Sequence, residues 1–544
     1  MLSVVNRRRC LQLVAVAWGL LLLASYLWRP LFPVDETRYV SVAWEMWLNG
    51  NYLVPHLNGV FYPDKPPLLF WLINLGWSVF GVSEGWARLV PALFALGSFW
   101  LLGRLAERFW PMEARSACLA PLFFLGAIFI ALYSTAVMFD MLVVFFALAA
   151  VLGLWRAASG RPVSGWLGFG LMVGFGILAK GPVILVYVMP GVLLAPWWAP
   201  ARPDGGWREW YAGALIGVLL SFAVVAVWLV SASVFASDNY LHAILIDQTA
   251  DRVSGDIGHG RPVWWYVQWL PLVILPWTLW PPLWRGFTQM RGRDGKRDPG
   301  TRLLVLSLAM IFVVLSAVGG KQVHYLLPGI ALAALLAAHA VGTRVESVSR
   351  RSQWPVAGFF ILLGAFFAGL SRGWYPTSWP AWVNTMPAMA GILIMIVGLW
   401  LAWLPITRPV RAVAAVTAAG VLVVIAVMYG PIRTMQHSYD LTSISRFLGS
   451  QQALGRPLGY VGHYQGQFAF LGRLRKPITV LRPEQARVWV DAHPQGLLIA
   501  RDQRVFGDAN VRPVFVHGYR SGEMEIYDNN ALIHSQARFG DGED

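Results

Sequence analysis

Residues 29–86 read RPLFPVDETRYVSVAWEMWLNGNYLVPHLNGVFYPDKPPLLFWLINLGWSVFGVSEGW. This stretch lies between two apolar runs, and it places Asp35, Arg38, Asp64 and Lys65 beside a membrane. Charged side chains are scarce in the chain as a whole, since 57% of its 544 residues are hydrophobic and only 13% are charged. Charge near lipid is costly unless it is paired or performs chemistry. We therefore expect this loop to hold one edge of a catalytic site.

Apolar runs of about 20 residues, the length that a bilayer-spanning helix needs, recur between residues 11 and 429. A soluble core would not contain so many uninterrupted runs, so the sequence predicts an all-α polytopic membrane protein with about thirteen transmembrane helices. The first run continues to Trp28 without a clean cleavage site, which favours a retained signal anchor over a signal peptide. The predicted spans are 11–28, 86–105, 116–133, 136–155, 166–178, 182–198, 210–232, 263–283, 303–318, 325–341, 354–370, 386–403 and 413–429.

Basic residues concentrate in alternate loops between these spans, which is typical of cytoplasmic loops. Three such loops contain Arg104, Arg108 and Arg115, then Arg156 and Arg161, then Arg202 and Arg208. We therefore place the N-terminus in the cytoplasm. With an odd number of spans, the C-terminal segment faces outward together with the long loops 29–85 and 233–262. The net charge of +15 follows from this topology and does not indicate nucleic-acid binding.

Two helices are expected inside the first outer loop. Residues 37–48 place apolar side chains at helical intervals, which suits an amphipathic helix lying on the membrane surface. Pro66 and Pro67 then introduce a second apolar segment, and proline is well suited to the first turn of a helix. That segment is too short for a safe span, so we interpret it as a second interfacial helix.

The composition becomes more polar after Tyr429. A helical segment is expected at 443–454, and short β-like runs follow at 458–461, 478–481, 497–500, 514–516 and 524–527. We therefore divide the chain into a transmembrane domain over residues 1–431 and a C-terminal soluble α/β domain over residues 432–544. Cys10 and Cys118 lie in or near predicted spans, so no disulfide scaffold is expected.

The outward loops collect residues that suit the transfer of a sugar from a polyprenyl phosphate. Negative charge grows on the leaving phosphate as the sugar bond breaks, so the phosphate needs cations. The candidate cations are Lys65, Arg38, Arg252 and Lys321. The acceptor needs a carboxylate for orientation or proton removal, and Asp35 is the first candidate, with Asp140 second.

Each candidate also has a structural interpretation. Asp35 or Glu36 could cap the helix that follows, because carboxylates stabilise a helix N-terminus. Lys65 could anchor the chain at the interface, and Lys321 could be an ordinary juxtamembrane charge. His324 is favoured as a hydrogen-bonded loop residue over a metal ligand, because no ligand spacing supports it. No soluble cofactor motif is present, and assistance by a divalent metal stays an open alternative.

The first loop contains the segments PVDETRYVSVAWEM, YLVPHLNGVFYPDKPPLLFW and GWARLVPAL. Further along, the chain contains MFDMLVVF, LAKGPVILV, DQTADRV, RPVWWYVQWLPLVILPW and KQVHYLLPGIALA. These segments, in this order, resemble those of the bacterial 4-amino-4-deoxy-L-arabinose lipid A transferases, in the wider GT-C group that includes protein O-mannosyltransferases. The family often has Glu where this chain has Asp64, and often has His in the segment before the arginine, where this chain has residues 249–251.

The resemblance implies an inverting-type glycosyltransferase of the bacterial inner membrane. Such an enzyme moves aminoarabinose from undecaprenyl phosphate to a lipid A phosphate at the periplasmic face, which confers resistance to polymyxin and cationic peptides. It implies that Asp35 is a key carboxylate, that Asp140 is a second acid and that Lys65 binds the donor phosphate. Further donor-site residues implied by the resemblance are Arg38, Tyr62, Arg252 and Tyr325.

Other functions were weighed against this one. A transferase of the same fold could use another polyprenyl-linked sugar or a protein hydroxyl acceptor. A lipid-linked sugar transporter would fit broken spans near Lys180, but the charges cluster in outer loops and no internal repeat is present.

The expected partners are the lipid-linked donor, lipid A and membrane lipids, without nucleic acid, and the chain is expected to act as a monomer. Whether the loop 233–262 becomes ordered when donor binds stays an open alternative.

Overall fold

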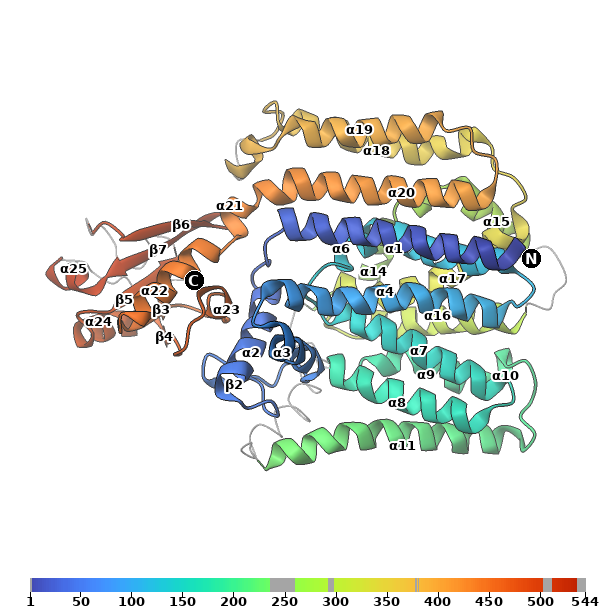
Figure 1. Ribbon diagram of the computed structural model, residues 1–544, viewed down its shortest axis with the longest axis horizontal. Helices are drawn as coiled ribbons and strands as arrows, with labels where there is room; N and C mark the ends of the chain where they lie inside the picture. The colour runs from blue at the N-terminus through green and yellow to red at the C-terminus, as the bar shows by residue number, and fades with distance from the viewer. Residues whose placement is uncertain are drawn as a thin grey trace.

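The computed structural model of the protein describes residues 2–234, 260–291, 298–376, 379, 381–501 and 511–535. Within these ranges, nine helices are long and apolar enough to cross a membrane. They run side by side in one bundle, with the N-terminus at the end opposite a C-terminal sheet (Figure 1). The helices are α1 (Leu2–Trp28), α4 (Glu84–Phe109), α7 (Asp140–Ala158), α8 (Pro162–Lys180), α11 (Gly206–Ser233), α16 (Pro299–Ala317), α17 (Leu327–Arg344), α18 (Trp354–Leu370) and α20 (Pro409–Val427).

The other four predicted spans are built from shorter helices. The span 116–133 is divided into α5 (Ala114–Gly126) and α6 (Ile128–Tyr133), and 182–198 is divided into α9 (Ile184–Leu193) and α10 (Ala195–Trp198). The span 263–283 begins as α14 (Trp265–Val273), continues through η2 (Trp277–Leu279) and reaches α15 (Pro281–Arg291), whereas α19 (Ala388–Trp403) is a single helix of 16 residues. Proline lacks a backbone N–H and therefore interrupts helical hydrogen bonding, as at Pro276 between α14 and η2. The prediction of a polytopic all-α membrane domain is confirmed.

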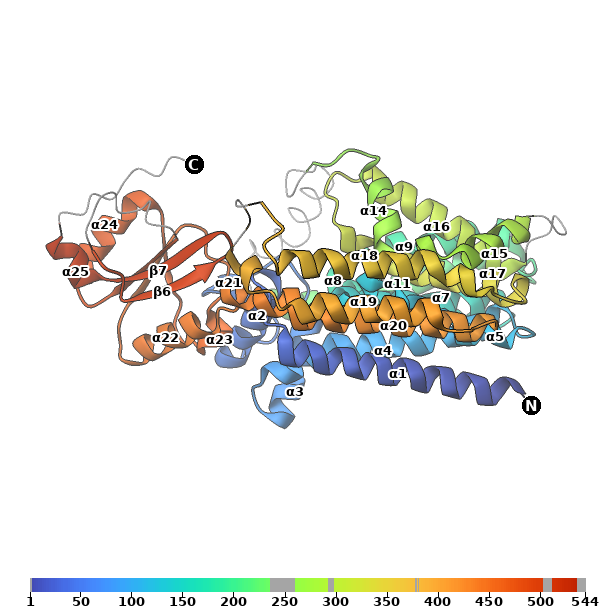
Figure 2. The same ribbon diagram turned by 90° about the horizontal axis from the view of Figure 1, so that it is seen from above.

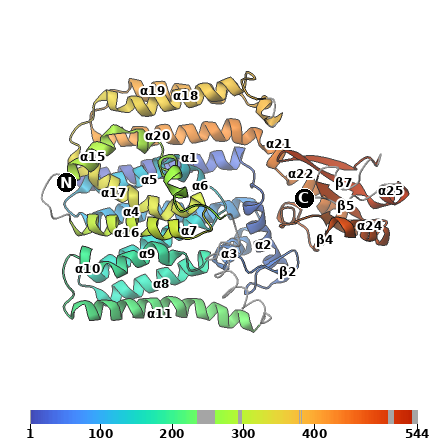
Figure 3. The same ribbon diagram turned by 180° about the vertical axis from the view of Figure 1, so that it is seen from behind.

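The first outer loop contains both helices that the sequence predicts. Helix α2 spans Asp35–Asn49 and α3 spans Leu68–Phe80. A hairpin of β1 (His56–Leu57) and β2 (Val60–Phe61) lies between them, and it turns at Asn58 and Gly59, which both have positive φ angles. Seen from above, α3 lies beside the bundle (Figure 2). Seen from behind, α2 and α3 lie between the bundle and the C-terminal sheet (Figure 3).

The two cysteines are paired, contrary to the expectation from sequence. Cys10 in α1 and Cys118 in α5 form a disulfide with a Cα–Cα distance of 5.6 Å. The two cysteines are 108 residues apart, so no local sequence pattern indicates the contact. The packing of α1 against α5 brings the two side chains together.

The C-terminal region forms a five-stranded mixed sheet in the order β4-β3-β5-β7-β6. Strand β3 runs parallel to β4 and β5, whereas β7 is antiparallel to β5 and β6. Apolar side chains of the helices pack against the strands in two separate clusters. The elements are α21 (Gln436–Tyr439), α22 (Thr442–Ala453), β3 (Leu458–Val461), α23 (Ala469–Gly472), β4 (Thr479–Leu481), α24 (Pro483–Ala492), β5 (Leu497–Arg501), β6 (Phe515–Tyr519), β7 (Gly522–Asp528) and α25 (Asn529–His534).

Candidate active site

Asp35 and Arg38 form an ion pair at the start of α2. Arg38 Nη2 donates to Asp35 Oδ1 at 2.5 Å, and the hydroxyl of Tyr39 lies 3.4 Å from the same oxygen. The two paired residues are one helical turn apart, which is the spacing at which side chains on a helix meet. The structure gives α2 no side-chain cap, so the capping role considered for Asp35 is not observed. The Asp35 side chain is 52% exposed, and it can therefore reach a bound substrate.

Glu36 has a structural role instead. Its carboxylate accepts hydrogen bonds from Arg29 Nη2 at 2.5 Å, from the Phe32 N–H at 2.9 Å and from the Val137 N–H at 2.5 Å. The residue is buried. These bonds attach the segment before α2 to the segment before α7, so Glu36 fixes the distance between the two ends that carry Asp35 and Asp140.

Asp140 and Lys180 form a second, buried ion pair. Asp140 is the first residue of α7 and Lys180 is the last residue of α8, and Lys180 Nζ donates to Asp140 Oδ1 at 2.6 Å. Lys180 Nζ also lies 4.9 Å from the centre of the Tyr325 ring, within the range of a cation–π contact. The second oxygen of Asp140, Oδ2, is buried and has no hydrogen-bond partner among the described residues. A buried carboxylate oxygen without a partner is unusual in a folded protein, which makes Asp140 a candidate functional residue.

The 3₁₀ turn η3 (Val323–Leu326) presents His324 and Tyr325 to this pair. Tyr187 donates to the Tyr325 carbonyl at 2.8 Å, and Tyr266 donates to the Gln322 carbonyl at 3.2 Å. These two bonds hold the turn between α9 and α14. His324 lies close enough to Asp140, Lys180, Asp35 and Lys65 to interact with them electrostatically, so it lies among the acids and cations of the site.

Lys65 and Tyr62 reach the site from the loop after the hairpin. Lys65 Nζ donates to the Asp64 carbonyl at 3.1 Å and interacts electrostatically with Asp140. Tyr62 is buried, and its ring centre lies 6.4 Å from that of Phe70 in α3. Phe70 in turn contacts Phe139, the residue before Asp140, with ring centres 5.6 Å apart. This aromatic cluster joins the loop to the start of α7.

The guanidinium of Arg38 keeps its positive charge at this position. Burial alone lowers the pKa of its guanidinium. The neighbouring Tyr62, Tyr39 and Asp35 have the opposite and larger effect, so the pKa of Arg38 lies above its ordinary value. A guanidinium that is always charged can bind phosphate through two parallel hydrogen bonds.

The predicted site residues therefore divide into three groups. The structure brings Asp35, Arg38, Tyr62, Lys65, Asp140 and Tyr325 together at the end of the bundle nearest the C-terminal sheet. Lys321 is buried, and its ammonium donates to the carbonyls of Arg261 at 3.0 Å and Val318 at 2.5 Å, where it joins two chain segments. Arg252 lies outside the described residues.

Two residues of this cluster were absent from the predicted site, namely Lys180 and His324. Lys180 could have been found from the sequence, because a lysine at the end of an apolar helix needs a partner and Asp140 is a carboxylate at the start of another. His324 could not, since nothing in its spacing distinguishes it from an ordinary loop histidine. Among residues 2–234, 260–291 and the later described ranges, no group of three or more His, Cys, Asp or Glu side chains could hold a metal ion.

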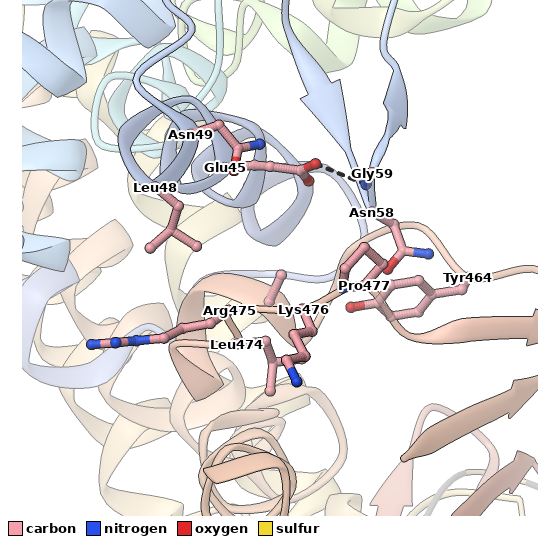
Figure 4. Close-up of a pocket in the computed structure, with 11 residues that line it drawn as sticks. Glu45, Leu48, Asn49, Asn58, Gly59, Tyr464, Leu474, Arg475, Lys476 and Pro477 are labelled. Atoms are coloured by element: carbon pink, nitrogen blue, oxygen red, sulfur yellow. Dashed lines mark hydrogen bonds between the residues drawn. The ribbon is translucent and has the colours of Figure 1, made fainter. Parts of the chain in front are cut away.

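A cavity of about 130 Å³ lies away from this cluster, between α2, the hairpin and the C-terminal domain (Figure 4). Glu45 lines it and accepts a hydrogen bond from the Gly59 N–H at 2.7 Å. The charged ends of Arg475 and Lys476 point away from Glu45 (Figure 4). The arrangement does not resemble a phosphate site, and the cavity is not the predicted donor site.

Comparison with known sequences finds similarity to sugar transferases. The family model described as dolichyl-phosphate-mannose-protein mannosyltransferase matches residues 64–230. An undecaprenyl phosphate-α-4-amino-4-deoxy-L-arabinose arabinosyl transferase of Erwinia tasmaniensis is 29% identical over 318 residues, which are 58% of this chain and 55% of that protein. The chain thus aligns with about half the length of this relative. A Pseudomonas paraeruginosa protein of the same name is 27% identical over 84% of this chain and 82% of its own length.

Comparison with solved structures shows the fold. The crystal structure of ArnT from Cupriavidus metallidurans bound to undecaprenyl phosphate matches with a TM-score of 0.73 and 19% identity. The match covers 95% of this chain and 97% of that one. The apo form matches with a TM-score of 0.71. These findings confirm the resemblance that the motifs indicated: the chain is a multi-pass membrane protein with the fold of the ArnT structures, and its sequence is similar to those of the aminoarabinose transferases.

Proposed function

We propose that the protein transfers 4-amino-4-deoxy-L-arabinose from undecaprenyl phosphate to a phosphate of lipid A. The observation that carries this proposal is the cluster of Asp35, Arg38, Lys65, Asp140 and Lys180 at one end of a bundle with the fold of ArnT. Two relatives that align with 74% and 84% of this chain are named undecaprenyl phosphate-α-4-amino-4-deoxy-L-arabinose arabinosyl transferases.

The cluster can supply what the transfer requires. A lipid A phosphate oxygen attacks the anomeric carbon of the sugar, the bond from that carbon to the donor phosphate breaks, and undecaprenyl phosphate leaves with the electron pair. In this proposal, Lys65 and Arg38 neutralise the charge that develops on this phosphate. Attack from the opposite side of the sugar gives inversion.

The carboxylates have a positioning role in this account. A phosphate monoester is largely ionised near neutral pH, because its second pKa is about 6, so the acceptor needs no strong base. Asp35 is exposed at the surface of the site and can orient the sugar or bind its amine. Asp140 is held by Lys180 through one oxygen, and its other oxygen has no hydrogen-bond partner among the described residues, which makes it a candidate acceptor for a substrate group.

We further propose that the site faces the periplasm and that the chain lies in the inner membrane of a Gram-negative bacterium as a monomer. The N-terminus lies at the end of the bundle opposite the C-terminal sheet (Figure 1), and the loops at that N-terminal end are rich in arginine. The positive-inside rule therefore assigns the N-terminal end to the cytoplasm and the C-terminal domain, residues 432–544, to the periplasm.

A second candidate follows from the match to the mannosyltransferase model over residues 64–230. A transferase of that kind would use a protein hydroxyl as acceptor. A hydroxyl must lose its proton during attack, so the rate would depend on an ionised base and would fall as pH decreases.

The two candidates are separated by acceptor. Purified protein in detergent is supplied with radiolabelled undecaprenyl phosphate-aminoarabinose and with either lipid A or a serine- and threonine-rich peptide. Label on lipid A alone supports the proposal. Label on the peptide alone supports the second candidate and removes the first.

A further inference from the structure

The C-terminal domain reaches the candidate active site through one side chain. Arg38 Nη1 donates to Oε1 of Gln465 at 3.1 Å, although the two residues are 427 positions apart in the chain. The other terminal nitrogen of the same guanidinium holds Asp35. Arg38 is thus fixed between a carboxylate of its own helix and an amide of the C-terminal domain.

Gln465 is itself held in place. Its backbone N–H donates to Oε1 of Gln467 at 2.9 Å, and Gln467 is buried. The next residue, Gly466, has a φ of +73°, and a Cβ atom there would lie only 2.4 Å from Leu57 of the hairpin. The loop therefore has a backbone that favours glycine and is packed directly against β1.

Polar contacts fasten this loop to α2. Ser41 Oγ donates to the Gly466 carbonyl at 2.7 Å and accepts from the Phe470 N–H at 3.1 Å. One turn later, Trp44 Nε1 donates to the Leu474 carbonyl at 2.8 Å. All three contacts are buried. The C-terminal domain is therefore bound along the helix that begins with Asp35, on the turns that follow Arg38.

The hairpin is fastened to the same domain. Asn58 Nδ2 donates to the Ile478 carbonyl at 2.8 Å, and its Oδ1 accepts from the Ile478 N–H at 2.8 Å. This reciprocal pair fixes the loop that leads to Tyr62 and Lys65. Both parts of the first outer loop that supply predicted donor-site residues are thus oriented by the C-terminal domain.

We propose that Gln465 is a positioning residue of the transferase, through which the C-terminal domain sets the orientation of Arg38 toward the donor phosphate. The inference rests on the proposed function, because it takes Arg38 as a donor-site cation. The Arg38 side chain is 19% exposed, and Gln465 and Asp35 each occupy one N–H group of its two terminal nitrogens, so further N–H groups of the guanidinium are left for a ligand.

The experiment compares four variants of the full-length protein: Gln465→Leu, Gln465→Glu, Arg38→Ala and the double change Gln465→Leu/Arg38→Ala. Leucine removes the acceptor at similar size, whereas glutamate retains an oxygen for Arg38. Gln495→Leu is the control, since Gln495 is an exposed glutamine of the same domain. Donor kcat/KM, undecaprenyl phosphate affinity and thermal unfolding are measured for each.

We expect Gln465→Leu to lower kcat/KM and undecaprenyl phosphate affinity by about tenfold or more, as is typical for a lost hydrogen bond to a charged group. For Gln465→Glu, kcat/KM and undecaprenyl phosphate affinity should stay within about threefold of those of the unchanged protein. In the Arg38→Ala background, Gln465→Leu should lower neither quantity further, because the effects of interacting residues are not additive. A merely structural role would not produce rescue by glutamate or this non-additivity.

The inference is overturned if Gln465→Leu matches Gln495→Leu, or if its effect is undiminished in the Arg38→Ala background. A failure of the proposed function has a different signature. In that case the unchanged protein transfers no aminoarabinose, yet the undecaprenyl phosphate affinities still distinguish Gln465→Leu from Gln465→Glu.

Discussion

Asp35 is the residue on which the proposed chemistry depends most. Its carboxylate is half exposed, and its side-chain contacts with Arg38 and Tyr39 lie within its own helix. We therefore expect Asp35→Asn to lower transfer by at least about a hundredfold, the effect typical of a lost transition-state contact, without loss of folding. Lipid A labelling reports transfer, and undecaprenyl phosphate binding reports an intact donor site. Transfer at the normal rate would remove Asp35 from the mechanism.

The Asp140–Lys180 pair should behave differently, because both side chains are buried. Removing one partner leaves an uncompensated charge, which costs about 3–5 kcal/mol in buried pairs. Lys180→Met should therefore lower the unfolding temperature in detergent, and Asp140→Asn/Lys180→Met should recover part of that loss. Transfer should be lost in both. If the double change is no more stable than Lys180→Met, the buried pair does not explain the stability of this end of the bundle.

At the residue scale, the sequence pointed to single charged residues better than to the contacts between them. Asp35, Arg38 and Lys65 were selected as candidates because charged side chains beside lipid are costly unless they are paired or perform chemistry. The Asp140–Lys180 contact was not predicted, because it joins residues 40 positions apart on two helices. No feature of the sequence pointed to Gln465, since a glutamine in a polar domain is ordinary and its partner Arg38 is 427 residues away.

Helices α4, α16 and α17 are joined at the opposite end of the bundle by His339. Its imidazole contacts Glu113 at 2.7 Å and Asp298 at 3.3 Å, and it stacks on Trp110 with ring centres 4.1 Å apart. Asp298 also caps α16 by accepting from the Thr301 N–H at 2.9 Å. Burial favours a raised pKa for Asp298, but the hydrogen bonds from His339 and Thr301 outweigh it and hold the pKa well below its ordinary value.

This depressed pKa predicts a pH dependence. A carboxyl with a lowered folded-state pKa adds stability above its unfolded-state pKa of about 3.9, and that stability is lost as pH falls toward the folded-state value. Asp298→Asn should therefore be less stable than the unchanged protein at neutral pH, and the difference should shrink below about pH 4. Thermal unfolding at several pH values measures this, with the exposed Asp204→Asn as control. A difference that is constant between pH 7 and pH 3 would contradict the assignment.

At the element scale, the predictions from sequence were accurate where one hydrophobic periodicity or one turn residue determines the element. Helix α2, the helix after Pro66 and Pro67, and α22 lie within a few residues of their predicted bounds. The interruptions at α5–α6 and α9–α10 were not predicted, because hydropathy counts apolar residues and does not register where helical hydrogen bonding stops. The disulfide was missed for a related reason, since only tertiary packing brings Cys10 to Cys118.

At the scale of the whole molecule, the end of the bundle that carries the candidate active site is covered by the first outer loop and by the C-terminal domain together. Hydropathy predicted the bundle, because apolar runs of spanning length are visible in the sequence itself. The orientation that the positive-inside pattern assigns to the bundle stays a prediction. The contact between the two ends of the chain depends on the folded shape of each, and no local pattern encodes it. The fold shared with ArnT over 95% of the chain includes both parts.

The most direct test of the central claim is mass spectrometry of lipid A from a Gram-negative strain that makes the donor but lacks its own transferase. The strain is complemented with the unchanged gene, with Lys65→Ala or with Lys476→Ala, which removes an exposed lysine of the C-terminal domain as control. The account predicts an aminoarabinose-sized mass gain with the unchanged gene and with Lys476→Ala, and none with Lys65→Ala. No mass gain from the well-expressed unchanged protein, or an equal gain from Lys65→Ala, would contradict it.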